Sequence, residues 1–596
     1  MRPGGGRAGA LAGGVLALLA LGPLLVPGYV LTYDMVFVPR LDLTRGLLGL
    51  DTAVARAVPA DLLVALASRV VPADLVQKLV LAGVFVGAGA GAARLTPTSR
   101  PAARAAAAVL YAWNPFVYER LVLGHWSLLV SYAALPWVVC AAVELRTRSA
   151  GAPRRLVGAL AVAAFGSPPG GVIAAGVALC VVAAPPWAVR RPAPPPATGV
   201  LRRAGLVVGS ALLVNAPWLV PSLLRPGGVP VRAAGAAAFA ARPDGPLGTV
   251  GSLVGLGGIW NALAVPPGLG SWPWLAGFTV VLVVAAAGLP PLLRRWERGA
   301  AVGLLLAAGL GLLVGAAYAL PWLRPLVDLA VARLPGGGLV RDAQKFVAPL
   351  AVVEAVAFGL GVERVLAASF GGTAAQAARL RRVAAAGLVA APVLLLPALA
   401  WGAAGRLAAV DYPPAFAEAR TAMAADPGPG AVLVLPWHLY MAHPWNGDRV
   451  VLDPAQRWFT RRAVGNDDLE LAGLTVPGED PYGARLGPLV RGSAPLGPAM
   501  PAAGVRYVLL FKAGDWPAYP PRLAGLEPVA DRPELVLYRV PGPPAEVRFA
   551  TPPAVPVLVA DLLAGAVVLW AWSGLSLPAR PRQLISSGRH SEGGQV

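Results

Sequence analysis

One acidic residue, Asp34, stands where a long apolar run ends. It lies in the stretch LTYDMVFVPR (31–40), with Tyr33 and Phe37 close by in the chain. A carboxylate beside apolar side chains loses hydration, which favours its protonated form. Acids near a membrane are candidates for function. The alternative is that Asp34 caps a following interfacial helix or pairs with Arg40, and position alone leaves both interpretations open.

A pair of cations forms the second candidate group. Arg341 and Lys345 in the stretch VRDAQK are four residues apart, so on a helix they share one face. They precede a long apolar segment, which predicts a position at the depth of lipid phosphates. We expect them to bind a phosphate, with Asp342 turned away. The alternative is that two long cationic side chains simply reach the membrane interface.

A third candidate group falls in one short turn, YERLVLGHW. Glu119, Arg120 and His125 are close enough in sequence to contact a sugar or a pyrophosphate together. Trp126 ends the turn, but aromatic residues are common at membrane interfaces and carry little information. An internal pair between Glu119 and Arg120 is the competing interpretation.

The segment WHLYMAHPWNGDRVVLDPAQRWFTRR (437–462) holds the last candidates. Trp437 and His438 could contact a glycan, because aromatic faces stack on sugar rings. Packing in a domain core is the alternative. The histidines are too loosely spaced to predict a metal site. A divalent cation therefore stays possible as a cofactor without a ligand set in the sequence.

The composition indicates which kind of protein must position these residues. The chain has 596 residues, of which 57% are hydrophobic and only 13% charged. So few charges cannot cover a water-soluble protein of this length, and long apolar segments recur along it. The net charge of +20 comes mostly from arginines in short loops between apolar segments. That placement indicates membrane orientation and argues against nucleic acid as a partner.

The apolar segments predict about twelve transmembrane helices. Approximate spans are 9–30, 75–93, 102–116, 127–145, two within 156–186 that are separated by SPPGG, 204–223, 273–292, 300–320, 346–363, 383–402 and 553–574. A shorter interfacial helix is expected at 61–71. Arginine-rich loops fall on one side if both termini are cytoplasmic. That orientation places Asp34, Glu119, His125 and Asp342 outside, in a multi-pass protein of the plasma membrane.

The polar region 403–551 predicts a small α/β domain on the same outer side. VLVLPW (432–437), VRYVLLF (505–511) and LVLYRV (535–540) are β-rich runs bounded by Pro, Gly or Asp. The expected organisation is a helical membrane domain over 1–402, this domain over 403–551, and a last helix with a cytoplasmic tail over 552–596.

Three segments carry a resemblance to a known family. AWNPFVYERLVLGHW (112–126), VRDAQKFVAPL (340–350) and AGVRYVLLF (503–511) resemble actinobacterial membrane proteins related to the arabinofuranosyltransferases of cell-wall arabinan. The architecture resembles the GT-C class of membrane glycosyltransferases. That resemblance implies Asp34 as the base or as the group that positions the acceptor. Many GT-C members have two adjacent acids in the first outer loop, and here Asp34 has no acidic neighbour.

The resemblance implies an extracytoplasmic enzyme in the lipid bilayer. It would transfer a sugar from a polyprenyl-phosphate donor to a cell-envelope glycan or lipid acceptor. One alternative is a transporter or flippase of lipid-linked sugars, which should carry ionisable groups at mid-membrane; Glu354 is an exception in otherwise uncharged helix interiors. A non-catalytic protein of envelope assembly is the other alternative.

Overall fold

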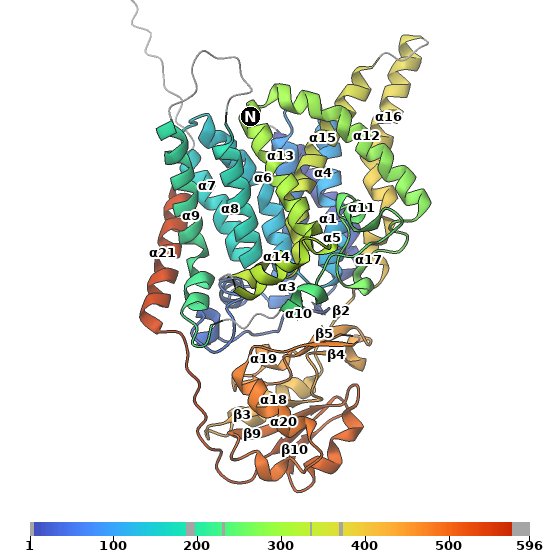
Figure 1. Cartoon of the computed structure of the whole chain (residues 1–596). Coiled ribbons are helices and arrows are strands. Elements are labelled where there is room, and N and C mark those ends of the chain that lie inside the picture. The colour runs from blue at the N-terminus through green and yellow to red at the C-terminus, as the bar shows by residue number, and fades with distance from the viewer. Residues whose placement is uncertain are drawn as a thin grey trace, which may run out of the picture.

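The protein consists of a helical bundle standing over a smaller unit that contains most of the strands (Figure 1). The computed structural model describes residues 5–185, 197–228, 233–333, 336–368, 373–471 and 473–574. Up to residue 404, the described regular elements are helices except for one two-residue strand, β1 (Tyr29–Val30), and strands and short helices follow until the last helix returns to the bundle.

Eight helices of the described residues are long and apolar enough to cross a membrane, or nine if one bent pair forms a single span. They are α1 (Gly5–Leu21), α3 (Ala73–Leu95), α6 (Trp126–Arg146), α9 (Ala197–Leu223), α12 (Trp272–Arg295), α13 (Arg298–Ala316), α15 (Ala348–Ala367) and α21 (Ala554–Ser573), with α16 (Ala374–Leu395) and α17 (Ala400–Ala404) as the bent pair. The polytopic helical fold predicted from composition is therefore confirmed.

The count of twelve spans is not confirmed by length and composition. The three remaining predicted spans correspond to α4 (Pro101–Ala112), α7 (Ala152–Gly166) and α8 (Pro168–Ala183). At 1.5 Å per residue these helices are about 18–24 Å long, whereas the apolar core of a bilayer is about 30 Å thick. The break at SPPGG lies where the sequence predicts it. The Ser167 hydroxyl accepts a hydrogen bond of 3.1 Å from the Gly170 amide and so caps α8.

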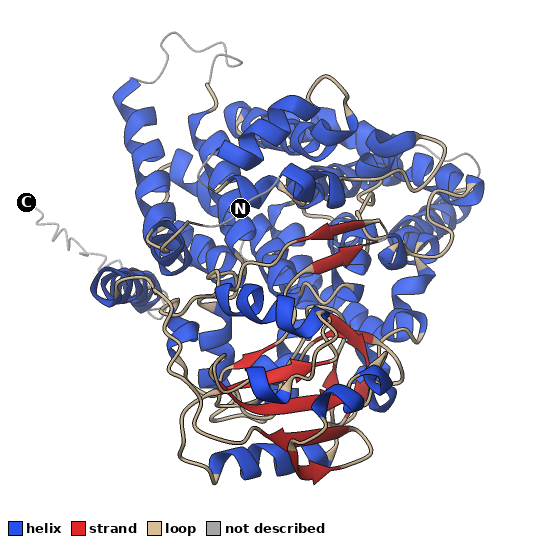
Figure 2. Ribbon diagram, turned by 60° about the horizontal axis from the view of Figure 1, so that its bottom comes forward, coloured by secondary structure: helices blue, strands red, loops and turns tan. Residues whose placement is uncertain are grey.

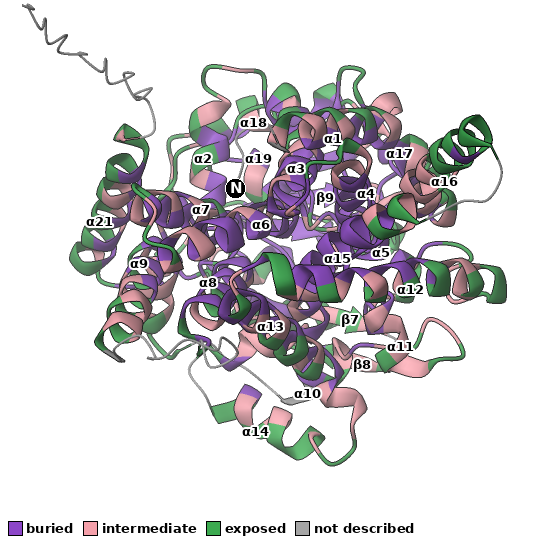
Figure 3. Cartoon of the chain, turned by 90° about the horizontal axis from the view of Figure 1, so that it is seen from above, coloured by how far each residue is buried: buried purple, intermediate pink, exposed green. Residues whose placement is uncertain are grey.

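Close backbone packing holds the centre of the bundle. A Cβ atom at Gly361 in α15 would lie 1.8 Å from the Val284 carbonyl oxygen of α12, and one at Gly288 would lie 1.8 Å from the Ala357 oxygen. Helices in membranes commonly approach through such small residues. Seen along the bundle, α15, α4 and α6 are largely buried, whereas α16, α21 and the short helix α14 (Arg324–Arg333) carry exposed residues at the periphery (Figure 3).

The shorter helices lie between these spans. They are α2 (Ala60–Ala67), at the expected interfacial helix, α5 (Pro115–Val122), α10 (Ala233–Ala238), α11 (Gly248–Val254) and α14 (Arg324–Arg333).

The smaller unit is built on a mixed five-stranded sheet of order β10-β11-β9-β3-β6 (Figure 2). Its strands are β3 (Ala431–Leu435), β6 (Ala463–Val464), β9 (Val505–Phe511), β10 (Glu527–Asp531) and β11 (Leu535–Arg539). The accompanying helices are α18 (Pro414–Ala424), α19 (Ala455–Trp458) and α20 (Pro481–Arg491), and two small hairpins pair β4 (Tyr440–Ala442) with β5 (Val450–Leu452) and β7 (Leu469–Leu471) with β8 (Leu474–Val476). All three strands predicted from sequence are present. They are neighbours in the sheet, with β3 parallel and β11 antiparallel to β9.

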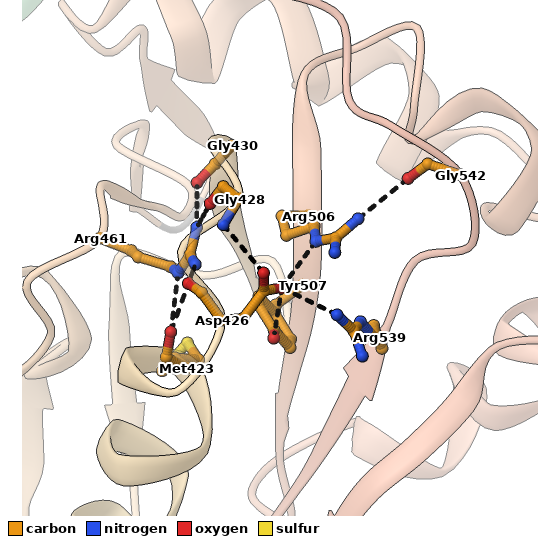
Figure 4. A network of polar contacts seen from close by, with 9 residues as sticks. All are labelled: Met423, Asp426, Gly428, Gly430, Arg461, Arg506, Tyr507, Arg539 and Gly542. Carbon is orange, nitrogen blue, oxygen red and sulfur yellow. Dashed lines mark hydrogen bonds and ion pairs between the residues drawn. The ribbon is translucent and has the colours of Figure 1, made fainter.

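The partly buried carboxylate of Asp426 ties the turn after α18 to the sheet (Figure 4). Asp426 accepts hydrogen bonds from Arg506 Nε (2.8 Å), the Tyr507 hydroxyl (2.9 Å), Arg539 Nη2 (3.2 Å) and the Gly428 amide (2.9 Å). The hydrogen bond from Arg506 is the main reason why the pKa of Asp426 lies below its usual value. Charge-assisted hydrogen bonds of this kind are among the stronger polar contacts in proteins.

The loop after α1 is joined to the smaller unit by backbone hydrogen bonds. β1 (Tyr29–Val30) pairs antiparallel with β2 (Ala409–Val410). The Tyr33 amide donates to the Val450 carbonyl (2.7 Å), and the Leu452 amide donates to the Tyr33 carbonyl (2.9 Å). Asp34 is therefore fixed between the helical bundle and the smaller unit.

Candidate active site

Asp34 lies at the junction of the two units and contacts both. Its Oδ2 atom is 3.2 Å from His125 Nε2 in the bundle, and its Oδ1 atom accepts a 2.5 Å hydrogen bond from the Tyr440 hydroxyl of β4. The carboxylate is still 44% exposed. It does not pair with Arg40, which contacts Asp42 instead at 3.4 Å.

The backbone next to Asp34 is strained. Tyr33 has a φ of 38°, in a region that bulky residues rarely adopt. The backbone hydrogen bonds of Tyr33 with Val450 and Leu452 hold this conformation in place. Strain of this kind concentrates at functional sites.

The environment of Asp34 favours its ionised form, which corrects the expectation of raised proton affinity. Burial by itself raises the pKa of this carboxyl. The hydrogen bonds from His125 and from the Tyr440 hydroxyl, with the charge of Arg56, outweigh burial, so that the pKa of Asp34 lies below its usual value. Asp34 therefore presents a carboxylate at neutral pH.

A buried arginine stands behind His125. Arg120 Nη1 lies 3.0 Å from His125 Nδ1, and the same guanidinium holds Asp342 through bonds of 2.6 and 3.1 Å. An arginine N–H can only donate, so His125 Nδ1 accepts and Nε2 carries the proton that faces Asp34. One chain of polar contacts thus runs from Asp34 through His125 and Arg120 to Asp342.

This chain corrects two further expectations. Asp342 is not turned away. Its carboxylate is held by Arg120, and although burial raises its pKa, the charges of Arg120 and Lys345 bring the pKa well below the usual range. Arg341 and Lys345 do not share one face of an α-helix, because two 3₁₀ turns, Gly337–Val340 and Ala343–Val347, are separated by residues 341 and 342.

Arg341 and Lys345 nevertheless lie in the same electrostatic neighbourhood. Lys345 is only 8% exposed and lies within reach of the charges of Arg341 and Arg56. The Arg341 guanidinium stacks over the Phe239 ring, 4.5 Å from its centroid. Within the described residues neither of the two forms an ion pair, whereas Arg56 is paired with Glu479. The charge of Asp342 also reaches Lys345, but that carboxylate is held by Arg120. A buried ammonium that shares its nearest carboxylate in this way is stabilised by an anion bound beside it.

Glu119 and Arg120 are both completely buried, so neither contacts a bound sugar directly in this conformation. Glu119 accepts a hydrogen bond from Gln344 Nε2 (3.2 Å), and its Oε1 atom has no hydrogen-bond partner among the described residues. Burial, and then the nearby Asp244 carboxylate, raises the pKa of Glu119 well above its usual value. The competing interpretation, an ion pair between Glu119 and Arg120, is not found among the described residues either, since Arg120 is held by Asp342 and Gln344. Of the three residues in this turn, His125 alone is partly exposed.

Trp437 does not offer a face to a glycan. Its side chain is 5% exposed and packs in the core of the smaller unit, against residues of the sheet. His438 lies nearer the surface, where Nδ1 is 2.9 Å from Glu470 and Nε2 is 3.2 Å from Asp515. Burial lowers the pKa of His438, but the two carboxylates outweigh it and raise the pKa. Among the described residues, no group of three or more His, Cys, Asp or Glu could hold a metal ion.

Sequence reasoning missed three residues of this cluster. Tyr440 contacts Asp34 from 406 positions away in the chain. Gln344 connects Arg120 with Glu119, and Arg56 acts on Asp34 through its charge. Tyr440 falls within the aromatic segment 437–462, but no spacing rule connects that segment with the first loop.

The cluster combines the groups needed to transfer a group from a phosphate. An ionised carboxylate is open to solvent on one side and hydrogen-bonded by His125 and Tyr440 on the other. Arg341 and Lys345, which form no ion pair in the part of the chain that the structure describes, place positive charge within reach of Tyr440 and Asp342 in the same cluster. A carboxylate can accept a proton from a hydroxyl, and fixed cations stabilise a departing phosphate.

Comparison with known proteins supports the fold. No protein-family model and no curated protein sequence matches the chain. The structure is similar to the single-particle cryo-EM structure of the arabinofuranosyltransferase AftD from mycobacteria, with a TM-score of 0.57 and 17% identity over 91% of this chain and 40% of that chain. Two classes of a mutant AftD give TM-scores of 0.55 and 0.51, also at 17% identity, over 90% and 91% of this chain and 42% and 41% of theirs. The chain thus spans about two-fifths of AftD, and the resemblance inferred from sequence is confirmed as a shared fold.

Proposed function

We propose that this protein transfers a sugar from a polyprenyl-phosphate donor to a cell-envelope glycan or lipid acceptor at the outer face of the plasma membrane. The observation that carries the proposal is the cluster at the junction of the two units. There the exposed carboxylate of Asp34 is hydrogen-bonded by Tyr440, which lies within reach of the Arg341 charge, and the polar chain through His125 and Arg120 leads to Asp342, which feels the charge of Lys345. Arg341 and Lys345 form no ion pair within the described residues. The fold shared with AftD supports the same reaction class.

In this proposal the reaction is a direct displacement. The acceptor hydroxyl attacks the anomeric carbon, its proton passes to Asp34, and the bond between that carbon and the phosphate oxygen breaks. Lys345 and Arg341 compensate the charge of the departing polyprenyl phosphate. His125 and Tyr440 hold the Asp34 carboxylate in position, and Arg120 fixes the tautomer of His125 from behind.

The proposed topology has twelve spans with both termini in the cytoplasm, counting α4, α7 and α8 as spans. The arginine-rich loops support it. Arg94 and Arg155 meet Glu144 at the ends of α3, α6 and α7 that are remote from Asp34. Cations concentrate in cytoplasmic loops of membrane proteins. The proposed division of the chain is 1–402, 403–551 and 552–596.

The decisive experiment is a transfer assay with purified protein and polyprenyl-phosphate sugars. Asp34→Asn should abolish transfer while the protein keeps its thermal stability. Asp411→Asn, a matched change at an exposed acid in the smaller unit, should retain transfer. Equal transfer by the wild type and Asp34→Asn would refute the role of Asp34.

A second assay tests the cations. The double variant Arg341→Gln/Lys345→Gln should raise the KM for the donor more than it lowers kcat, because it removes phosphate contacts present in the bound state. Unchanged donor binding would show that both side chains only reach toward the interface.

One observation favours transport of lipid-linked sugars as a second candidate. Glu354 is buried within α15, and its Oε2 atom has no partner among the described residues. Intramembrane acids often mark transport pathways. Two results together would support transport over transfer. The wild type would show no sugar transfer, and Glu354→Gln would lose the translocation of lipid-linked sugars that the wild type performs.

A further inference from the structure

A cavity of about 680 Å³ lies on the side of the bundle, away from the Asp34 cluster. Its walls come from α3, α6 and α7, and Trp572 of α21 adds one side chain. The volume falls within the range of about 300–1,000 Å³ that is usual for small-molecule sites. The lining is mainly Val, Ala and Gly, which suits a hydrocarbon chain.

Glycines keep this cavity open. A Cβ atom at Gly83 would meet nothing within 4 Å, and one at Gly87 would meet only Ala133 Cβ at 3.7 Å. Gly158 faces the Trp572 indole, whose Nε1 atom would lie 3.3 Å from an added Cβ. The missing side chains therefore widen the space between α3 and α7.

One end of the cavity is charged. The Glu144 carboxylate accepts charge-assisted hydrogen bonds from Arg94 Nη2 at 3.3 Å and from Arg155 Nε at 2.5 Å. Arg154 stands beside them, stacked over the Trp570 ring at 5.2 Å. Of these groups, Arg94, Arg155 and Glu144 line the cavity, so one carboxylate faces two guanidinium groups and leaves an excess of one positive charge where the apolar cavity ends.

This charged end is far from the proposed catalytic cluster. Gln77, near the start of α3, accepts a hydrogen bond of 2.9 Å from the Val30 amide in the loop that holds Asp34. Arg94 lies 17 residues further along the same helix, about 26 Å away at 1.5 Å per residue. An anion bound at Arg94 and Arg155 is therefore not the phosphate of a donor at Asp34.

We propose that this cavity binds one anionic phospholipid from the leaflet opposite Asp34. An acyl chain lies along Gly83 and Gly87, and the headgroup phosphate contacts Arg94 and Arg155. The charge excess selects an anionic headgroup, and the apolar walls exclude a free phosphate as the complete ligand. The proposal does not depend on the catalytic function.

The bound lipid also has a structural consequence. Only 28% of the apolar window of α21 is buried, the smallest share among the eight candidate spans. Trp572 borders the cavity, so a lipid chain there bridges α21 to α3 and α6. Lipid binding should consequently stabilise the packing of the last helix.

Native mass spectrometry of the purified, delipidated full chain tests the proposal. Added phosphatidylglycerol should bind at one lipid per chain, about tenfold more tightly than phosphatidylcholine. Gly83→Leu fills the cavity without a backbone clash and should weaken phosphatidylglycerol binding about tenfold. Gly176→Leu, at another exposed helix glycine with nothing within 4 Å, is the control and should bind as the wild type does.

The headgroup is tested separately. Arg155→Gln should remove the preference for phosphatidylglycerol over phosphatidylcholine, and inorganic phosphate should not displace the lipid. Equal binding of the two lipids to the wild type, or equal effects of the two glycine variants, would overturn the proposal. Tighter binding of a polyprenyl phosphate than of phosphatidylglycerol would overturn the choice of ligand. Thermal unfolding of each variant shows whether a loss of binding reflects misfolding.

Discussion

The ion pair between Arg120 and Asp342 gives the sharpest prediction about stability. Arg120 is completely buried, and Asp342 holds it with two hydrogen bonds of 2.6 and 3.1 Å. Asp342→Asn keeps the shape of the side chain but removes its charge. The guanidinium is then left in the interior without a counter-charge, and removing one partner of a buried pair costs about 3–5 kcal/mol.

Thermal unfolding in detergent measures this cost. A thiol-reactive dye reports unfolding when the buried Cys140 becomes accessible. The matched control is Asp531→Asn, which breaks a pair with Lys512 of 2.7 Å in which the acid is 66% exposed. Exposed pairs contribute only about 0–1 kcal/mol, so the control should unfold close to the wild-type temperature. Scan rates must be equal, because unfolding of large proteins is often irreversible.

The pH dependence follows from the direction of the Asp342 shift. Its pKa in the folded state lies below the usual carboxyl value, so its contribution is fully present above the unfolded pKa and is lost as pH falls toward the folded pKa. The wild type should therefore lose stability on acidification more steeply than Asp342→Asn. If Asp342→Asn unfolds at the same temperature as Asp531→Asn, the loss of the Asp342 charge does not cost the predicted amount of unfolding free energy, about 3–5 kcal/mol.

Three further predictions concern the site, the sheet and the bundle. Tyr440→Phe removes a hydrogen bond that lowers the pKa of Asp34, so the acid limb of the transfer pH profile should move to higher pH; an unchanged limb would contradict this. Asp426→Asn should destabilise the smaller unit by about 3 kcal/mol, with loss of the acid-dependent part of its stability, as followed by chemical denaturation. Gly361→Ala should lower the free energy of unfolding by more than about 2 kcal/mol, because the added Cβ would overlap the backbone of α12. Gly387→Ala is the control and should have little effect, because nothing lies within 4 Å of an added Cβ there. Equal melting temperatures of the two variants would argue against the close contact between α12 and α15.

Several features of the fold followed from the sequence alone. Apolar segments of about 20 residues with arginines between them indicate spanning helices, because a single segment can satisfy its own backbone within a bilayer only as a helix. The proline and glycine run at SPPGG had to interrupt a helix, and α8 begins there. The three β-rich runs became adjacent strands of one sheet. These results depend on local chemistry and periodicity, which a sequence displays directly.

Only part of the candidate site could be predicted from the sequence. Asp34 and His125 could be singled out as ionisable groups at the ends of apolar runs, and the structure brings them to 3.2 Å. Burial of Trp437 in the domain core could not be predicted from its neighbours in sequence, because an aromatic residue between Pro436 and His438, at the end of an apolar run, fits a surface or a core equally well.

The sequence by itself determined that this is a helical membrane protein with a strand-containing unit near its C-terminal end. Only the tertiary structure decided that Tyr440 reaches Asp34, that Asp342 holds Arg120, and that the pKa of Asp34 falls instead of rising. The physical reason is that hydropathy acts along the chain, whereas a pKa or an ion pair depends on which distant side chains arrive within a few ångströms. Residues 34 and 440 meet because β1 pairs with β2 and Tyr33 bonds to Val450, and such long-range pairing leaves no mark in the local sequence.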